Sequence, residues 1–170
     1  MATTFTVSSG DFMRPFKSRP RIQHFPMAAT QTFKLGEPLI MDAASTENRV
    51  KVAANSPTSL IVGVAAANAA DVANSDGTTA GALVPVWCAT HDAVFRAVGK
   101  ANQALDYTDL SVGLAILKDA TNNIWYIDNT STGADAVVPL TIIAPAVQGD
   151  FQGYYSFRFA AAASLFIATV

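Results

Sequence analysis

Short apolar stretches separated by turn residues fill most of this chain, and their spacing limits how it can fold. From residue 31 onward, turn signals recur every ~8–14 residues, as expected of short strands joined by tight connections. No amphipathic helical pattern of ordinary length is present. The spacing predicts about nine or ten strands in an all-β sandwich or small β-barrel.

Four segments predict particular local structures. Gly63 interrupts the apolar run Ser59–Ala65 and predicts a bulge or kink in a buried strand. Pro85 lies inside the stretch Gly81–Ala89 and predicts either an edge strand or a bulge there. The polar residues Lys118–Asn123 predict a hairpin turn between two apolar strands. Ala65–Ala73 is rich in alanine and predicts one or two helical turns.

The first 34 residues differ from the rest in charge. They hold five basic residues and one acidic residue, a net charge of +4, whereas the remaining 136 residues have a net charge of −6. Three prolines and the lack of any period oppose regular structure over residues 1–30. We therefore expect two parts: an extended N-terminal arm, residues 1–30, and a single β domain, residues 31–170.

The arm is richer in aromatic residues than disordered tails usually are, which favours docking on a partner, with a mobile tail as the alternative. We expect it to bind a partner protein, with phenylalanines as anchors and basic side chains that orient it. Nucleic acid is a weaker alternative, because four clustered charges are not specific for phosphates. The expected contact residues are Phe5, Phe12, Arg14, Phe16, Lys17, Arg19, Arg21 and Phe25.

Charged residues make up only 14% of the chain, against about 25% in typical domains. A surface so poor in charge is less protected against association, which favours an oligomer or a permanent partner. We expect no membrane span, because the longest apolar stretch, Ala160–Val170, is about half the length required. The N-terminus lacks the pattern of a signal peptide, which predicts synthesis in the cytoplasm.

The residues favour no catalytic, cofactor or metal site. The one local cluster is Cys88–Asp92, in which Cys88 and His91 could share a metal or form a thiolate pair. Cys88 alternates with Val84 and Val86, so a small core residue is the better interpretation. The oxygen-rich loop Asp128–Asp135 lacks the ligand spacing of an EF-hand and is interpreted as a solvated turn.

The order and spacing of several segments resemble the head decoration (cement) proteins of tailed phages, small β proteins on the outside of the filled head. The resemblance runs from about Phe33 to Phe159. It is carried by Phe33–Leu39, Leu60–Ala65, Val84–Trp87, Asp109–Ala115, Ile124–Asp128 and Gly149–Gly153.

This resemblance implies a β-tulip-like or related fold, a homotrimer on the outer capsid surface of the virion, and an arm that reaches across the major capsid protein. It implies a mechanical role rather than a reaction, with no direct contact to nucleic acid. The C-terminal residues Leu165, Phe166 and Ile167 are candidates for the oligomer interface, although an ordinary core strand explains them as well.

Three alternatives remain open. The first is another virion module, such as a tail component or fibre base. The second is a carbohydrate-binding β-sandwich that uses Trp87, Trp125 and Tyr126, which requires these aromatics to be exposed on one platform. The third is a hydrolase with His91 as base, which requires His91 to lie in a pocket beside a nucleophile.

Overall fold

The computed structural model of the chain describes residues 13–166, except residues 56, 58, 73–79, 120, 122, 132–135 and 145. Within these residues the fold is all-β, with three short 3-10 helices and no α-helix. The strands are β1 (Arg14–Pro15), β2 (Ile22–Pro26), β3 (Pro38–Met41), β4 (Val50–Val52), β5 (Ile61–Ala65), β6 (Leu83–Cys88), β7 (Phe95–Gly99), β8 (Ala115–Asp119), β9 (Ile124–Asp128), β10 (Val137–Ile143) and β11 (Tyr154–Phe159). The 3-10 helices are η1 (Ala69–Asp71), η2 (Tyr107–Asp109) and η3 (Ala161–Ala163).

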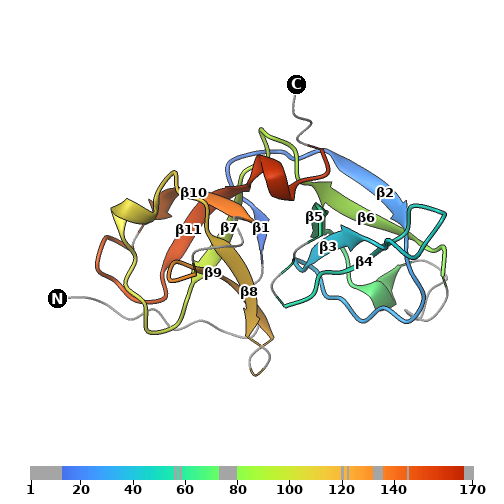
Figure 1. The fold of residues 1–170 in the computed structure, drawn as a ribbon, viewed down its shortest axis with the longest axis horizontal. Helices are drawn as coiled ribbons and strands as arrows, with labels where there is room; N and C mark the ends of the chain where they lie inside the picture. Colours follow the sequence, from blue (N-terminus) through green and yellow to red (C-terminus); the bar gives the residue numbers. More distant parts are fainter. Residues whose placement is uncertain are drawn as a thin grey trace.

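The strands form two sheets that lie side by side (Figure 1). The first sheet has the order β10-β11-β7-β9-β8, with β1 added to β7, and the second has the order β2-β6-β5-β3-β4. All pairs between these strands are antiparallel except β7 with β9. Over the described residues neither sheet closes into a barrel, so the sandwich alternative holds.

Both sheets nevertheless curl until their ends approach each other. Leu114, just before β8, forms a bridge with Val137 at the start of β10. Met27, just after β2, forms a bridge with Val50 on β4. The curl gives each sheet an inner face, which is where its large apolar side chains gather.

The first core lies within the first sheet and reaches the second. Tyr155, Phe157 and Phe159 alternate along β11 and are buried together, because alternate residues of a strand share one face. Phe95 on β7 meets Phe159 edge-on, with ring centroids 5.5 Å apart. Aromatic pairs in this geometry add about 0.5–1.5 kcal/mol beyond their burial.

Strand β5 is buried along its whole length because it separates the two cores. Ile61 and Val64 belong to the core shared with the first sheet, whereas Val62 and Ala65 belong to the core inside the second sheet. Gly63 is needed in this strand, since a Cβ atom there would lie 2.1 Å from the Trp87 carbonyl oxygen. The register of β5 against β3 shifts beside Gly63, so the predicted bulge is confirmed.

The hairpin predicted across Lys118–Asn123 is confirmed, because β8 and β9 pair with Asp119 opposite Ile124. The helical turns expected in Ala65–Ala73 are present as η1. The alternation at Gln31–Leu35 does not produce a strand; these residues connect β2 to β3, and Phe33 fills the core of the second sheet.

The expectation for the arm needs correction over its described part. Residues 13–30 are extended, but they belong to the sheets of their own chain: Arg14 is opposite Arg96 on β7, and Ile22–Pro26 pairs along β6. The physical reason is that β6 would otherwise be an edge strand beside buried apolar groups. Because β2 covers it, β6 is an internal strand despite Pro85. Residues 1–12, with Phe5 and Phe12, lie outside the described part.

Candidate functional site

The segment from Arg14 to Arg21, called here the basic segment, crosses from one sheet to the other. At its start the Phe16 amide donates to the Val94 carbonyl oxygen at 2.9 Å. Ser18 then bonds Val94 twice, donating through its hydroxyl at 2.8 Å and accepting from the amide at 2.9 Å. At its end the Cys88 amide donates to the Arg21 carbonyl oxygen at 2.8 Å. The backbone of this segment is therefore fixed at both sheets.

The side chains of the basic segment are held less closely than its backbone. Arg14, Lys17, Arg19 and Arg21 are all exposed, and none forms an ion pair with a described carboxylate. The Lys17 ammonium lies 5.2 Å from the centre of the Phe16 ring. Four exposed cations on one fixed segment make a positive surface that no carboxylate of the described residues compensates.

The other basic residues are arranged differently. Six basic residues follow Lys34, and four of them pair with carboxylates of the described residues at 2.5–2.9 Å. These pairs are Arg49–Glu47, Lys51–Asp42, Lys100–Asp128 and Lys118–Glu37. Among the described residues, the basic segment is therefore where exposed cations without a carboxylate partner lie closest together in the sequence; Lys34 and Arg158 are exposed singly elsewhere.

The predicted phenylalanine anchors are only partly available to a partner. The Phe25 side chain is half-buried and packs against Phe166, with ring centroids 6.1 Å apart, at the border of the second core. Because alternate residues of a strand point to opposite faces, Phe25 points inward while Ile22 and His24 point outward. The expectation that Phe25 anchors a partner is therefore not supported by its position. Phe16 is half-buried beside Lys17.

The three residues expected at an oligomer interface, Leu165, Phe166 and Ile167, differ in how available they are to a second copy of the chain. Leu165 is 38% exposed, and its amide donates to the Ile61 carbonyl oxygen at 3.0 Å. Phe166 packs onto Phe25 within the chain, so it completes the monomer's own core rather than a free surface. Ile167 lies outside the described residues.

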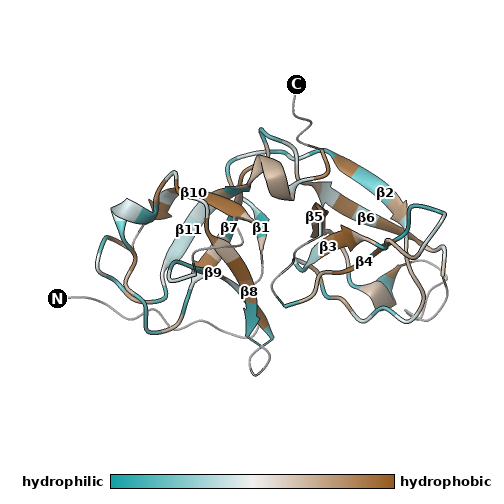
Figure 2. Ribbon diagram, viewed as in Figure 1, coloured by the Kyte–Doolittle hydropathy of each residue, from teal (hydrophilic) through white to brown (hydrophobic). Residues whose placement is uncertain are grey.

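The outer side of the β2–β6 ladder is apolar, which the sequence pattern did not reveal. Three cross-strand pairs share this side: Ile22 with Trp87, His24 with Pro85, and Pro26 with Leu83. Ile22 is 53% exposed and Leu83 is 57% exposed. Apolar segments are visible along β2 and β6 in Figure 2. Pro85 predicts an edge strand or a bulge, but β6 pairs with both β2 and β5 without a register shift. The proline is tolerated because it lies beyond the last β5 pair, Ala65 with Val86, where the ladder needs no donor.

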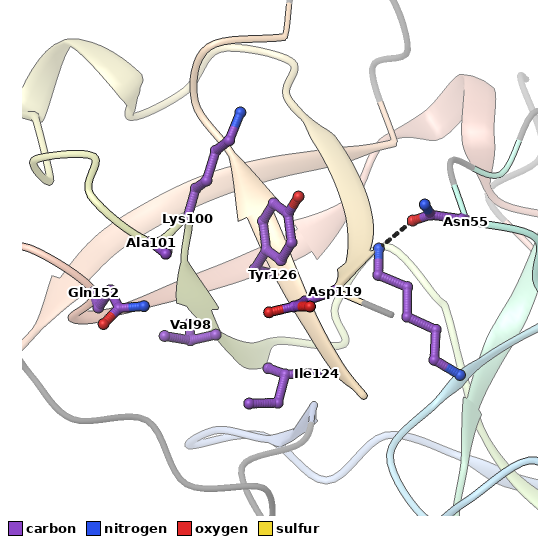
Figure 3. A pocket seen from close by; sticks show the side chains of 10 residues that line it. Asn55, Val98, Lys100, Ala101, Asp119, Ile124, Tyr126 and Gln152 are labelled. Carbon is purple, nitrogen blue, oxygen red and sulfur yellow. Dashed lines mark hydrogen bonds between the residues drawn. The ribbon is translucent and has the colours of Figure 1, made fainter. Parts of the chain in front are cut away.

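A cleft of about 480 Å³ lies at the outer face of the first sheet (Figure 3). Tyr126 stands near its middle, with apolar Val98 and Ile124 beside polar residues from other segments. The volume suits a small ligand. Its lining is Asn55, Val98, Gly99, Lys100, Ala101, Lys118, Asp119, Ile124, Tyr126 and Gln152.

Most polar groups of this cleft already serve the fold. The Lys100 ammonium bonds Asp128 at 2.9 Å, and the Lys118 ammonium bonds Glu37. Asn55 accepts from the Lys118 amide at 2.5 Å, and Asp119 accepts from the Thr121 amide at 2.8 Å. Burial raises the pKa of the Tyr126 phenol, which keeps it neutral. The cleft therefore gives little chemistry that is not already committed to structure.

The aromatic platform required by the carbohydrate alternative is not formed. Trp125 is buried, and its indole Nε1 donates to Glu37 at 3.3 Å. Trp87 is half-buried and packs against the first core. Tyr126 follows Trp125 on β9 and so points to the opposite face.

The surroundings of His91 do not meet the requirement set for a hydrolase. Cys88 is buried, and its burial raises the pKa of the thiol, which disfavours the thiolate. His91 is exposed beside a cavity of about 160 Å³, whose lining contains no hydroxyl, thiol or carboxylate side chain among the residues described there: Val138, Arg158, Phe159, Ala160 and Ala161. The core interpretation of Cys88 is confirmed.

Within the described ranges, no group of three or more His, Cys, Asp and Glu side chains is placed to hold a metal ion. No helix in the same part of the chain has the length and apolar character needed to cross a membrane. Comparisons with models of protein families, with curated proteins and with solved structures find no match.

Proposed function

We propose that this chain is a structural virion protein that binds the outer surface of a tailed-phage head and stabilises it. The supporting observation is the uncompensated positive surface of the basic segment: Arg14, Lys17, Arg19 and Arg21 are exposed and have no carboxylate partner among the described residues. Such a surface suits a negatively charged protein lattice.

The way the basic segment is held supports the same role. Its backbone is bonded to both sheets, so a partner need not order the main chain of this segment on binding, and only the side chains lose conformational entropy. A cementing protein gains from this arrangement, because it must bury area without a large rearrangement. The homotrimer belongs to the proposal and rests on the resemblance and on the low charge content.

The test is co-sedimentation of the full chain with emptied heads that lack it, assembled from the coat protein encoded in the same genome. We expect saturable binding that weakens as salt is raised, and heads that resist heating better when decorated. Absence of binding at low salt and micromolar protein would overturn the proposal.

A further inference from the structure

Along its strand order each sheet ends in two edge strands; in the first sheet, apart from the two-residue β1 that adds to β7, these are β8 and β10, and both are bonded by other parts of the chain. On β8, the Lys118 amide donates to the Asn55 side chain at 2.5 Å. On β10, the Pro139 carbonyl oxygen accepts from the Ser111 amide at 2.8 Å. Both edges are thereby blunted, as is usual for strands that must not associate.

The second sheet has one edge that is covered in the same way. On β4, the Val50 carbonyl oxygen accepts from the Ala28 amide at 2.9 Å. The Val52 amide donates to the Gln31 side chain at 3.0 Å. The connection that follows β2 therefore occupies the outward groups of β4.

The remaining edge, β2, has no such cover. The Cys88 amide bonds the Arg21 carbonyl oxygen, and the Met27 amide bonds the Ala82 carbonyl oxygen, both at 2.8 Å, so odd-numbered residues face β6. By the alternation of an antiparallel ladder, Ile22 and His24 direct their backbone groups away from β6. In the described part of the chain, these outward groups have no hydrogen-bond partner.

The side chains along this edge also suit a partner. Ile22 is half exposed, and the exposed cations Arg19 and Arg21 precede it directly. Pro20 and Pro26 stand at either end, and proline offers no amide for pairing. The usable edge is therefore the short stretch from Arg21 to Phe25.

We infer that this edge of β2 accepts an extended, acidic segment of the coat protein as a sixth strand of the second sheet. The inference rests on the proposed function and identifies the surface that carries it. Backbone bonds to Ile22 and His24 would supply affinity, and carboxylates facing Arg19 and Arg21 would set orientation.

Charge decides between this occupant and a second copy of the chain. Pairing β2 with another β2 would bring together two segments that each carry four cations without described carboxylate partners. Such a pair is also isologous and yields a two-fold dimer rather than a ring of three. An acidic strand compensates the cations instead.

Amide hydrogen exchange on the full chain, free and bound to the emptied heads, tests the inference without any substitution. We expect the Ile22 and His24 amides to exchange freely in the unbound protein and to become protected at least tenfold on the heads. The Gln23 and Phe25 amides, which face β6, should be protected in both states.

Two variants give an independent readout. His24→Pro removes one outward amide while leaving the β2–β6 bonds, and it should weaken binding to the heads at least tenfold. Ile22→Ser should weaken it several-fold without touching the backbone. Val147→Ser, at an equally exposed apolar residue away from β2, is the matched control and should bind as the wild type does.

The outcomes separate the two proposals. If the wild type does not bind the heads, the proposed function fails. If it binds but the Ile22 and His24 amides stay unprotected and His24→Pro binds normally, the strand-addition inference is wrong while the proposed function stands. If the Ile22 and His24 amides of the free protein become more protected as its concentration rises, a second copy of the chain occupies the β2 edge. This result would overturn the inference that a coat-protein segment binds there.

Discussion

Glu37 and Lys118 join the two sheets through a salt bridge of 2.5 Å, in which the carboxylate is only 6% exposed. Glu37 precedes β3 of the second sheet, and Lys118 lies on β8 of the first. The same carboxylate accepts from the Lys34 amide at 2.9 Å and from Trp125 at 3.3 Å. One buried acid thus holds three donors from both halves of the molecule.

Removing the charge of Glu37 while keeping the shape of its side chain should destabilise the folded protein. Glu37→Gln leaves the Lys118 ammonium beside a neutral group, and we expect the free energy of unfolding to fall by about 2–3 kcal/mol. Adding Lys118→Met to this variant should recover part of the loss. Urea unfolding measures both, and Glu47→Gln, in an exposed pair, should change stability by less than ~1 kcal/mol. Equal losses in Glu37→Gln and Glu47→Gln would contradict this role.

Tyr155 should make the protein sensitive to alkali. Its hydroxyl donates to Asp109 at 2.6 Å and accepts from the Asp106 amide at 3.2 Å. Burial, and then the bond to Asp109, raise the pKa of this phenol far above its usual value near 10. The unfolded chain therefore loses this proton first, so stability should decrease as pH rises above about 10.

Tyr155→Phe tests this explanation by thermal unfolding between pH 8 and pH 11. The variant should lose about 1–2 kcal/mol at pH 8, because two hydrogen bonds vanish, and should show a weaker decline at alkaline pH. Tyr107→Phe, at an exposed tyrosine, is the control. An unchanged alkaline decline in Tyr155→Phe would assign the effect to other groups.

Asp128 should make the stability of the folded protein decrease at acid pH. Burial alone would raise the pKa of this carboxyl, but its bonds to Thr130 and Lys100 outweigh burial and lower it. A lowered pKa in the folded state contributes stability above the unfolded value near 3.8, and this contribution is lost as pH falls through the folded value. Asp128→Asn should flatten the loss of stability below pH 4, measured by thermal unfolding. A steep acid decline that persists in the variant would argue against it.

The contact between Phe25 and Phe166 should matter for folding rather than assembly. Phe166→Ala removes one half-buried ring, and we expect a loss of about 1–3 kcal/mol with an unchanged oligomeric state. Leu165→Ser affects an exposed residue and should leave stability nearly unchanged. Light scattering measures the oligomeric state of both variants. If folded Phe166→Ala has a different molecular mass from the wild type, Phe166 belongs to an oligomer interface after all.

The basic segment should govern binding to heads through its charge. Arg19→Gln together with Arg21→Gln should weaken binding about tenfold at low salt and reduce the slope of affinity against salt concentration. The control is Arg158→Gln, an exposed arginine on β11. If the control weakens binding as much as the double variant, the effect is one of net charge and not of this segment.

Local patterns predicted much of this fold. The hairpin of β8 and β9, the bulge at Gly63 and the buried face of β11 could all be read from a few adjacent residues. The placement of residues 13–30 could not, because β2 pairs with β6 about 60 residues away and its own alternation mixes Gln23 with Phe25 on the inner face. For the same reason Phe25 and Phe166 could not be recognised as partners.

The exposure of cations was predictable from their number, but their partners were predictable only in part. Glu47 stands two residues before Arg49, so that pair could be expected from the sequence, whereas no acidic residue lies between Asp11 and Glu37 around Arg19 and Arg21. The pair of Lys51 with Asp42, nine residues away, needs the antiparallel pairing of β3 with β4.

Strand β5 has a further consequence, because each of its faces belongs to a different core. Neither sheet can lose its interior without exposing one side of this strand to water. The two halves should therefore melt in a single heat-absorption peak, even though they look like separate lobes. If the protein decorates a pressurised shell, as proposed, a force applied to one half should load both cores together instead of unfolding that half alone.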